Sequence, residues 1–325
     1  MTDVVQNCIA KIKGQKKKLV LPEGDDPRIQ QAALKLLELD IAEPVLLGDE
    51  LSIRQSSDFN LGSIPILDPA TDTTAELASA LIGKKRKITA DNVDSYLQNP
   101  VYRGVAMLNT GAVHAMVAGA VLPTSKVIEA AFAVGPKPGL KTLSSFFLMT
   151  LAPQIDEVAR SILFADCAIN IDPDIEQLAE IAITTADSAS RLLSEEPRLA
   201  MLSFSTHGSA RHASVSKVAD AVALVRSQRP DLKIDGEMQV DTALSSRVAK
   251  SKMDNPGDVA GRANVLIFPD LDAGNIAYKL VQYCGGAQAT GPVLQGFARP
   301  VCDLSRGATV DDIVSAAAVT IALSL

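Results

Sequence analysis

The segment Lys18-Leu19-Val20-Leu21 decides the fold class, together with the hexapeptide Pro22-Glu23-Gly24-Asp25-Asp26-Pro27 that follows it. The first four residues are typical of a short strand, and the prolines and glycine after them are typical of a turn. From Arg28 to Leu39 the apolar residues recur with helical spacing, and residues 44–48 predict a second strand. Strands that alternate with helices in this way favour a parallel sheet with helices on both faces.

The same alternation continues along the rest of the chain. Further strands are predicted at residues 64–69, 112–120, 142–149, 162–169, 198–204 and 265–268. Further helices are predicted at residues 75–81, 91–97, 127–134, 175–193, 215–225, 276–284 and 313–325. The sequence therefore predicts an α/β fold with mostly parallel sheets.

The composition agrees with this fold class. Hydrophobic residues make up 47 % of the chain, charged residues 21 % and aromatic residues 4 %, and there is no Trp. A core built from Ala, Val, Ile and Leu suits helices packed on a parallel sheet. A length of 325 residues suits two domains. The Gly- and Pro-rich residues 135–139 are the best candidate for a crossing between them.

The charge and the cysteine pattern limit the partners. The formal net charge is −7, and the basic clusters are confined to residues 16–18 and 84–87, which argues against nucleic acid. The four cysteines and three histidines are scattered without a C-x-x-C pair, so no metal site is expected. No apolar run reaches the ~18 residues of a membrane span, and residues 1–18 do not resemble a signal peptide. We therefore expect a cytoplasmic protein with no membrane partner.

A first candidate anion site follows the strand predicted at residues 112–120. Thr124, Ser125 and Lys126 lie between this strand and the next helix. Hydroxyls and a base at a helix start are suited to a phosphate group, because backbone N–H groups point outward there. The alternative is an ordinary strand–helix loop.

A second candidate lies in residues 205–212, between another strand and helix. This loop is rich in small hydroxyl residues and contains Ser209, Arg211 and one glycine, a combination that also suits an anionic group. His207 and His212 are interpreted as exposed loop histidines rather than ligands.

The segment around Ser305 and Arg306 is the third candidate. It precedes the apolar residues 313–325, and Thr309 and Asp312 fit the S/T-x-x-D/E pattern of a capping box. We therefore expect Ser305 and Arg306 just before a helix N-terminus, where the backbone N–H groups and the helix dipole favour an anion. The alternative is that the box only caps the helix and that Arg306 is a solvated surface charge.

Motifs along nearly the whole chain carry a resemblance to a known family. They are residues 21–25 (LPEGD), 144–149 (SSFFLM), 164–170 (FADCAIN), 196–203 (EPRLAMLS), 208–212 (GSARH), 235–241 (DGEMQVD), 268–275 (FPDLDAGN) and 303–307 (DLSRG). In these segments the chain resembles the phosphate acetyltransferases (phosphotransacetylases). Residues 208–212 are most similar to the ethanolamine-utilisation type.

The resemblance implies a reaction and an architecture. The reaction is acetyl-CoA + phosphate = acetyl phosphate + CoA, with coenzyme A as a substrate and with neither cofactor nor metal. The implied fold has two α/β domains like those of isocitrate and isopropylmalate dehydrogenases, an active-site cleft between the domains, and usually a homodimer. The first domain would comprise residues 1–138 and 297–325, and the second residues 139–296.

The resemblance also implies roles for three residues. Ser305 and Arg306 match an active-site pair, and Asp312 matches a general base. A free thiol has a pKa near ~8.5, so the attacking thiolate of coenzyme A needs a base nearby. Ser305 or backbone N–H groups would stabilise the oxyanion, and Arg306 would bind the phosphate in a bidentate manner. The capping role of Asp312 competes with this one, because a carboxylate held by the helix end is a weaker base.

The chain departs from the family pattern at three places. The basic segment is one residue short, so either Lys84 or Arg86 replaces the family arginine. The usual Ala-Val-His-Thr-Thr is Ala-Val-Leu-Pro-Thr at residues 120–124, and the family's substrate-binding arginine falls on Glu129. Lys126, three residues earlier, is expected to supply the positive charge, although it binds phosphate as a point charge and therefore more weakly. The alternative is a solvated Lys–Glu pair.

Three readings of the function follow. The first is an active phosphate acetyltransferase. The alternatives are a non-catalytic relative that binds coenzyme A or an acyl phosphate, and an acyltransferase for a longer acyl group. A dehydrogenase is disfavoured, because the chain has no G-x-G-x-x-G segment and no metal-ligand set.

Overall fold

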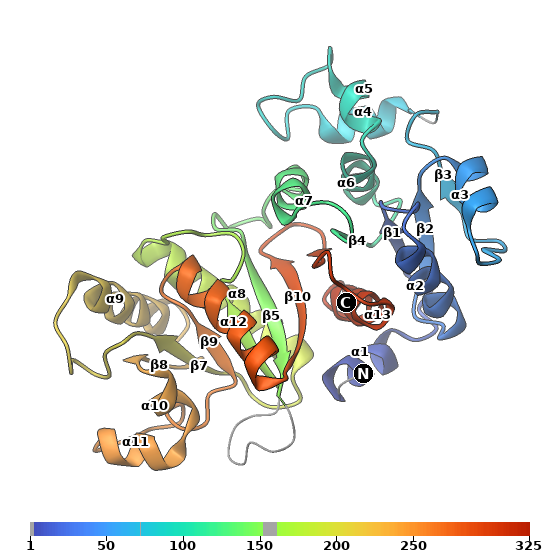
Figure 1. Ribbon diagram of the computed structural model, residues 1–325. Helices are drawn as coiled ribbons and strands as arrows, with labels where there is room; N and C mark the ends of the chain where they lie inside the picture. The colour runs from blue at the N-terminus through green and yellow to red at the C-terminus, as the bar shows by residue number, and fades with distance from the viewer. Residues whose placement is uncertain (1–2, 72, 152–160) are drawn as a thin grey trace. The chain divides into compact units, whose positions relative to one another are not determined.

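The computed structural model describes residues 3–71, 73–151 and 161–325 (Figure 1). In this part of the chain 13 helices and 11 strands form a mixed α/β structure whose strand pairs are mostly parallel. The chain divides into two compact units. Unit 1 comprises Met1–Gly139 and Phe297–Leu325, and unit 2 comprises Leu140–Gly296.

Unit 1 is built on a parallel sheet. Its strands lie side by side in the order β3 (Ile66–Leu67), β2 (Glu43–Leu47), β1 (Lys18–Leu21), β4 (Ala115–Ala118) and β11 (Val301–Asp303). Every residue of β4 and β11 is buried, as is usual for strands of a parallel sheet that is covered on both faces. Because all five strands run in one direction, their carboxyl ends lie along one edge.

The described residues of unit 1 form eight helices. They are α1 (Asp3–Ile12), α2 (Pro27–Glu38), α3 (Glu50–Ser56), α4 (Ala75–Leu81), α5 (Val93–Leu97), α6 (Pro100–Thr110), α7 (Thr124–Ala131) and α13 (Val310–Ala322). Ten consecutive residues of α13, from Ile313 to Ala322, are buried, and the helix contacts α1, α2, β4 and β11. A helix that is apolar on all sides is buried on all sides, so α13 is the central helix of this unit.

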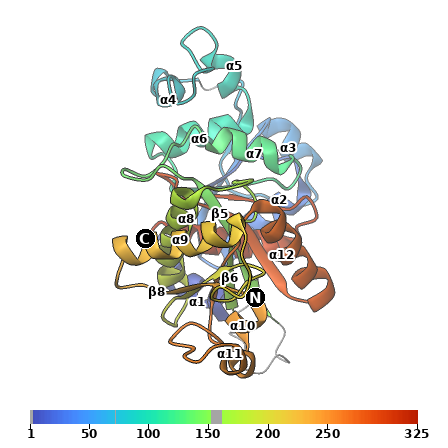
Figure 2. The same ribbon diagram turned by 90° about the vertical axis from the view of Figure 1, so that its left-hand side faces the viewer.

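Unit 2 has a mixed sheet. Its strands follow the order β10 (Gln288–Gln295), β5 (Ser144–Thr150), β6 (Ser161–Ala165), β9 (Val265–Ile267), β7 (Arg198–Leu202) and β8 (Lys233–Met238). The pairs of β5 with β10 and with β6 are antiparallel, whereas the remaining pairs are parallel. The helices are α8 (Ile175–Leu192), α9 (Ala213–Gln228), α10 (Val240–Leu244), α11 (Ser246–Lys252) and α12 (Leu271–Gly285). Of these, α8 and α9 pack side by side (Figure 2).

The structure confirms the predicted α/β class and most of the predicted elements, but several elements were missed, among them α1, β8 and β10. Helix α1 is a short segment that mixes apolar residues with Asp, Gln, Asn and Lys, and its buried residues are Val4, Val5, Cys8 and Ile12. Strand β8 ends the order of the sheet, and its sequence KIDGEM carries polar side chains that an edge strand tolerates. Strand β10 contains Gly291 and Pro292, which locally interrupt its pairing with β5.

Candidate active site

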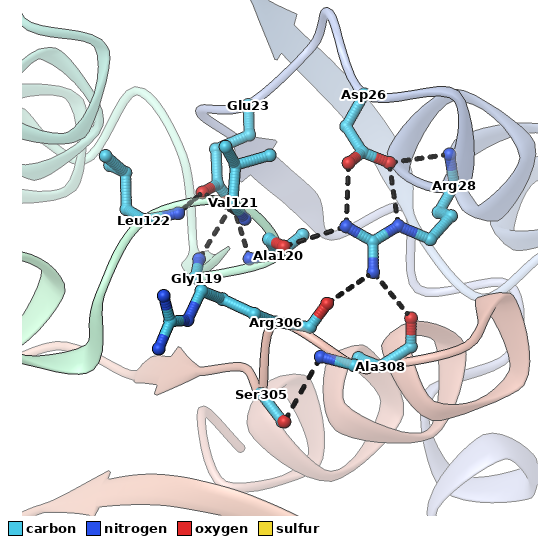
Figure 3. Close-up of polar contacts among 11 residues, drawn as sticks. Glu23, Asp26, Arg28, Gly119, Ala120, Val121, Leu122, Ser305, Arg306 and Ala308 are labelled. Atoms are coloured by element: carbon cyan, nitrogen blue, oxygen red, sulfur yellow. Dashed lines mark hydrogen bonds and ion pairs between the residues drawn. The ribbon is translucent and has the colours of Figure 1, made fainter.

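The carboxyl edge of the unit 1 sheet holds most of the predicted site residues. Strands β1, β4 and β11 end at Leu21, Ala118 and Asp303, and the segments that follow them are joined by hydrogen bonds (Figure 3). Ligands of open α/β sheets bind outside the carboxyl ends of the strands. This edge is therefore the candidate ligand site of unit 1.

Ser305 and Arg306 lie in a turn between β11 and α13, and both are exposed. The turn is closed by the N–H of Ala308, which donates to the carbonyl oxygen of Ser305 at 2.9 Å. The N–H of Gly307 donates to the Ser305 hydroxyl oxygen at 3.3 Å. The hydroxyl hydrogen of Ser305 therefore remains available to a ligand. In the described part of the chain the guanidinium of Arg306 has no hydrogen-bond or ion-pair partner.

The predicted capping box at the start of α13 is confirmed. Oγ1 of Thr309 accepts the N–H of Asp312 at 3.2 Å. Oδ2 of Asp312 accepts the N–H of Thr309 at 2.9 Å and its hydroxyl at 2.8 Å. No described residue donates a hydrogen bond to the other oxygen, Oδ1. The cap thus fixes the half-buried carboxylate and leaves one oxygen open.

Arg28, near the start of α2, connects this turn to its surroundings (Figure 3). Its Nη1 donates to the carbonyl oxygens of Arg306 at 2.8 Å and Ala308 at 3.0 Å. Its Nη2 donates to the carbonyl oxygen of Ala120 at 2.7 Å. Asp26 receives the remaining donors, Nε at 3.0 Å and Nη2 at 2.7 Å. Burial raises the pKa of Asp26, but hydrogen bonds from the side chain and backbone of Arg28 outweigh burial and hold that pKa below its usual value.

Glu23 organises the turn after β4. Its Oε2 accepts the N–H groups of Gly119 at 2.7 Å and Ala120 at 2.8 Å. Its Oε1 accepts those of Val121 at 2.9 Å and Leu122 at 2.8 Å. Four successive N–H groups that converge on one point form an anion-binding nest. Here the protein's own carboxylate fills the nest, so these N–H groups are not available to a phosphate.

Thr124, Ser125 and Lys126 form the first turn of α7, and all three are exposed. The sequence predicted a phosphate cradle at this place, and the preceding backbone N–H groups are bonded to Glu23 instead. Any anion bound at α7 would therefore depend on its side chains and on the N–H groups of the helix's own first turn. The hydroxyl of Thr124 faces Asp303 and lowers the pKa of that carboxyl.

Asp303 is a residue of this edge that the sequence analysis did not single out. It is 0 % exposed at the end of β11, and neither carboxylate oxygen has a hydrogen-bond partner of normal geometry among the described residues. Burial, and to a lesser extent the charge of Glu23, raises the pKa of Asp303 to about 7, despite the opposing effects of Thr124 and of the Leu304 N–H. A Cβ atom at Gly119 would lie 2.2 Å from its Oδ1, so only glycine fits there.

The basic segment at residues 84–87 contacts Glu129 through Lys85, which the sequence analysis did not single out. Lys85 donates to the carbonyl oxygen of Glu129 at 2.9 Å and lies 3.7 Å from its carboxylate. Lys126 lies 3.6 Å from the same carboxylate, which confirms the expected Lys–Glu pair. Lys84 and Arg86 are exposed and make no contact with Glu129 in the described residues. Both observed pairs are partly exposed and therefore weak.

The predicted coenzyme A residues Ser209 and Arg211 lie in unit 2, and both are near the surface. Oγ of Ser209 accepts the N–H of Thr206 at 2.9 Å. Glu237 holds the same turn by accepting the Ser205 hydroxyl at 2.8 Å and the Gly208 N–H at 2.7 Å. Arg211 has no partner within the part of the chain that the structure describes. Its guanidinium is therefore open to a ligand.

Neither metal binding nor a membrane span has support in the described ranges. In residues 3–71, 73–151 and 161–325, no group of three His, Cys, Asp or Glu side chains could hold a metal ion. No helix in the same ranges is both long and apolar enough to cross a membrane. A hollow of about 470 Å³ lies at the amino-end edge of the unit 1 sheet, lined by Val45, Ile64 and Met107 among others, and contains none of the predicted site residues.

The fold and this carboxyl edge place the chain among the α/β enzymes whose sites are built on the turns that follow parallel strands. Comparison with known proteins gives the family. The family model described as phosphate acetyl/butaryl transferase matches residues 3–321, and the chain belongs to this family.

Individual relatives agree with this assignment. The chain is 44 % identical over 324 residues to a phosphate acetyltransferase of Thermoanaerobacterium thermosaccharolyticum, covering 98 % of each. It is similar to the EutD phosphotransacetylase from Staphylococcus aureus, with 37 % identity, a TM-score of 0.88 and coverage of 99 % and 98 %. It is also similar to a phosphotransacetylase from Streptococcus pyogenes, with 37 % identity, a TM-score of 0.91 and coverage of 100 % and 99 %.

A more distant likeness concerns the fold alone. A 4-hydroxythreonine-4-phosphate dehydrogenase from Klebsiella pneumoniae is 14 % identical, with a TM-score of 0.52 and coverage of 95 % and 100 %. The resemblance predicted from the sequence motifs is thus confirmed. The protein is an enzyme, an acyltransferase with phosphate acetyltransferase function.

Proposed function

We propose that the protein catalyses acetyl-CoA + phosphate = acetyl phosphate + CoA by direct attack of the coenzyme A thiolate, without a covalent enzyme intermediate. The observation that carries the proposal is the turn from Ser305 to Asp312. It keeps the family's residues and lies at the carboxyl edge of the unit 1 sheet, with a fixed carboxylate and a guanidinium that pairs with no described residue.

Asp312 acts as the general base in this proposal. The thiol proton of coenzyme A passes to Oδ1, the oxygen that the capping box leaves open. The sulfur then bonds to the acetyl carbon of acetyl phosphate, and the bond from that carbon to the phosphate oxygen breaks. The proton on Asp312 returns to the leaving phosphate. Thr309 orients the carboxylate throughout through Oδ2.

Ser305 and Arg306 stabilise charge. The Ser305 hydroxyl accepts the Gly307 N–H and can donate its own hydrogen to the oxyanion that forms on the acetyl group. The planar guanidinium of Arg306 suits two oxygens of the phosphate. Both groups are exposed, so each can reach a ligand without a rearrangement of the fold.

The remaining binding roles are proposals of the same kind. Lys126, assisted by Lys85, supplies positive charge at the position where the family has an arginine and this chain has Glu129. Ser209 and Arg211 are proposed to contact coenzyme A. Further phosphate contacts are assigned to Thr124, Ser125, Lys84 and Arg86. No cofactor beyond the substrates is required by this scheme.

The assembly and location are also proposed. A cytoplasmic homodimer with two dehydrogenase-like domains and substrates in a cleft between them remains our prediction from the family resemblance. Exposed apolar side chains on one face of α12, Ile276, Leu280 and Tyr283, support association with a second copy. Sedimentation velocity is expected to give a dimer that Leu280→Glu dissociates, and a monomeric wild type would contradict this.

A direct test is thioester formation from acetyl phosphate and coenzyme A by the purified protein. We expect turnover that Asp312→Ala largely abolishes, and equal rates for the two proteins would overturn the proposal. Acyl phosphates of increasing chain length, assayed in the same way, define the acyl preference. Glu129 favours one alternative, a protein that binds coenzyme A without turning it over. Calorimetric binding in the absence of any thioester product would establish that alternative.

A further inference from the structure

We propose that Arg28 is a positioning residue for the reaction, holding the turn of Ser305 and Arg306 in its productive shape. The inference rests on the proposed function of that turn. It concerns a residue that contacts backbone oxygens rather than substrate.

The hydrogen bonding of Arg28 excludes a direct role in phosphate binding. A guanidinium has five N–H donors. In this structure two go to the carboxylate of Asp26, two to the carbonyl oxygens of Arg306 and Ala308, and one to that of Ala120. No donor is left over for a ligand. In this respect Arg28 is the opposite of Arg306, whose guanidinium has no partner in the described residues.

The contacts also determine which way the turn faces. Arg28 draws the carbonyl oxygens at positions 306 and 308 toward α2, and the side chain of Arg306 then extends away from Arg28 (Figure 3). The turn is thereby tied to two rigid elements, because α2 begins beside Arg28 and α13 begins just after Ala308. Reacting groups must be held to within a fraction of an ångström for efficient transfer.

Arg28 links this turn to the neighbouring one. Its bond to Ala120 reaches the turn after β4, whose four N–H groups are held by Glu23. Lysine cannot replace this arrangement. Its ammonium has three donors around one point, whereas the acceptors of Arg28 are spread around a planar fork. Arg28→Lys therefore keeps the charge and loses the geometry.

The test compares Arg28→Lys with a matched control, Arg54→Lys. Arg54 donates to the carboxylate of Glu50 and to the carbonyl oxygens of Gly62 and Ile64, and its side chain is 35 % exposed against 33 % for Arg28. It lies in the same unit and makes no contact with the turn of Ser305. Thermal unfolding of both variants checks that each remains folded.

Steady-state kinetics of acetyl-CoA formation is then measured for the wild type, both lysine variants, Ser305→Ala, and Ser305→Ala combined with each lysine variant. We expect Arg28→Lys to lower kcat on the order of 10- to 100-fold with less than about a threefold change in the KM for acetyl phosphate. Arg54→Lys is expected to leave both unchanged. Ser305→Ala is expected to lower kcat severalfold less in Arg28→Lys than in the wild type or in Arg54→Lys. In Arg28→Lys the Ser305 hydroxyl is already misplaced, so its removal has a smaller effect.

Three results would overturn the inference. They are a kcat of Arg28→Lys equal to the wild type, a loss of kcat that multiplies independently with that of Ser305→Ala, and a change confined to the KM for acetyl phosphate, which would indicate a substrate ligand. Wild-type protein without activity would instead overturn the proposed function, and the positioning role with it. The two failures are therefore distinguishable.

Discussion

Each unit has a buried aspartate at the carboxyl end of a strand. The two carboxylates differ in the number of hydrogen bonds that they accept. Asp166 follows β6 in unit 2 and is 3 % exposed, whereas Asp303 ends β11 in unit 1 and is 0 % exposed. Asp166 accepts six hydrogen bonds, from the N–H and hydroxyl of Ser145, the N–H groups of Ala168 and Ile169, and the N–H and side-chain amide of Asn170. Asp303 accepts none of normal geometry from the described residues.

The difference in hydrogen bonding indicates that Asp166 stabilises the fold, whereas the buried charge of Asp303 destabilises it. The bonds to Asp166 fix the backbone of the segment after β6, so its burial is compensated. No described residue compensates the burial of Asp303 with a hydrogen bond of normal geometry, and burial raises the pKa of this carboxyl to about 7. Uncompensated polar groups concentrate at functional sites, and Asp303 lies two residues before Ser305.

The largest effect is expected from Asp166→Asn, which tests the structural side of the comparison. An amide NH2 in place of one carboxylate oxygen would face backbone N–H donors, so several buried hydrogen bonds are lost together. We expect the free energy of unfolding to fall by about 3–5 kcal/mol, measured by urea denaturation. Asp174→Asn, at the exposed N-cap of α8, is the control and should change stability by less than about 0.5 kcal/mol. A fall of less than about 1 kcal/mol for Asp166→Asn would contradict a structural role of this carboxylate.

Arg306→Ala tests the functional side. We expect it to reduce transition-state stabilisation by roughly 2–4 kcal/mol, measured as kcat/KM, because a charged contact to the phosphate is lost. Stability should hardly change, since the side chain is exposed. Arg247→Ala on α11 serves as the matched exposed arginine, and an equal loss of activity there would contradict the assignment.

Asp303→Asn should act in the opposite sense from Asp166→Asn. Because the folded-state pKa lies above the unfolded value of 3.8, folding takes up a proton between about pH 4 and pH 7. The contribution of Asp303 to stability is therefore present below pH 4 and is lost as the pH rises through about 7. Asparagine does not titrate, so the variant should gain about 1–2 kcal/mol over wild type at pH 8, and little at pH 4.

Urea denaturation of both proteins at several pH values measures this difference directly, and the contributions of all other groups cancel in it. A difference that stays constant from pH 4 to pH 8 would mean that Asp303 is not the group that titrates. Activity measured in the same series shows whether a neutral side chain at this position also supports turnover.

Thr309→Ala should give the smallest effect. It removes the cap of α13 and one of the groups that orient Asp312, and we expect a loss of about 1 kcal/mol in stability. Activity should fall less than in Asp312→Ala, because Oδ1 remains as a proton acceptor. Thr74→Ala, which removes the N-cap of α4, should cost similar stability with unchanged activity. An equal fall in activity for the two caps would contradict a role for Thr309 in orienting the base.

Interactions between residues close together in the sequence could be predicted from it, whereas interactions between distant residues could not. The Thr309–Asp312 box was predictable because its partners are three residues apart and follow a known pattern. Arg28 was not, because its partners at Arg306 and Ala308 are 278 and 280 residues away and are backbone oxygens, which have no sequence signature. The absence of partners around Asp303 is equally invisible in the sequence. Lys85 was overlooked in favour of Lys84 and Arg86 because only the folded chain determines which of them points inward.

The return of the chain to unit 1 has a consequence for its synthesis. Strand β11 and helix α13, which complete the sheet and the core of that unit, come from Phe297–Leu325, after all of unit 2. All the residues of unit 2, by contrast, have been translated by Gly296. On the ribosome unit 2 can therefore finish folding while the nascent unit 1 still lacks its central helix, and a premature stop codon just after Gly296 would prevent unit 1 from forming although its first residues are made earlier.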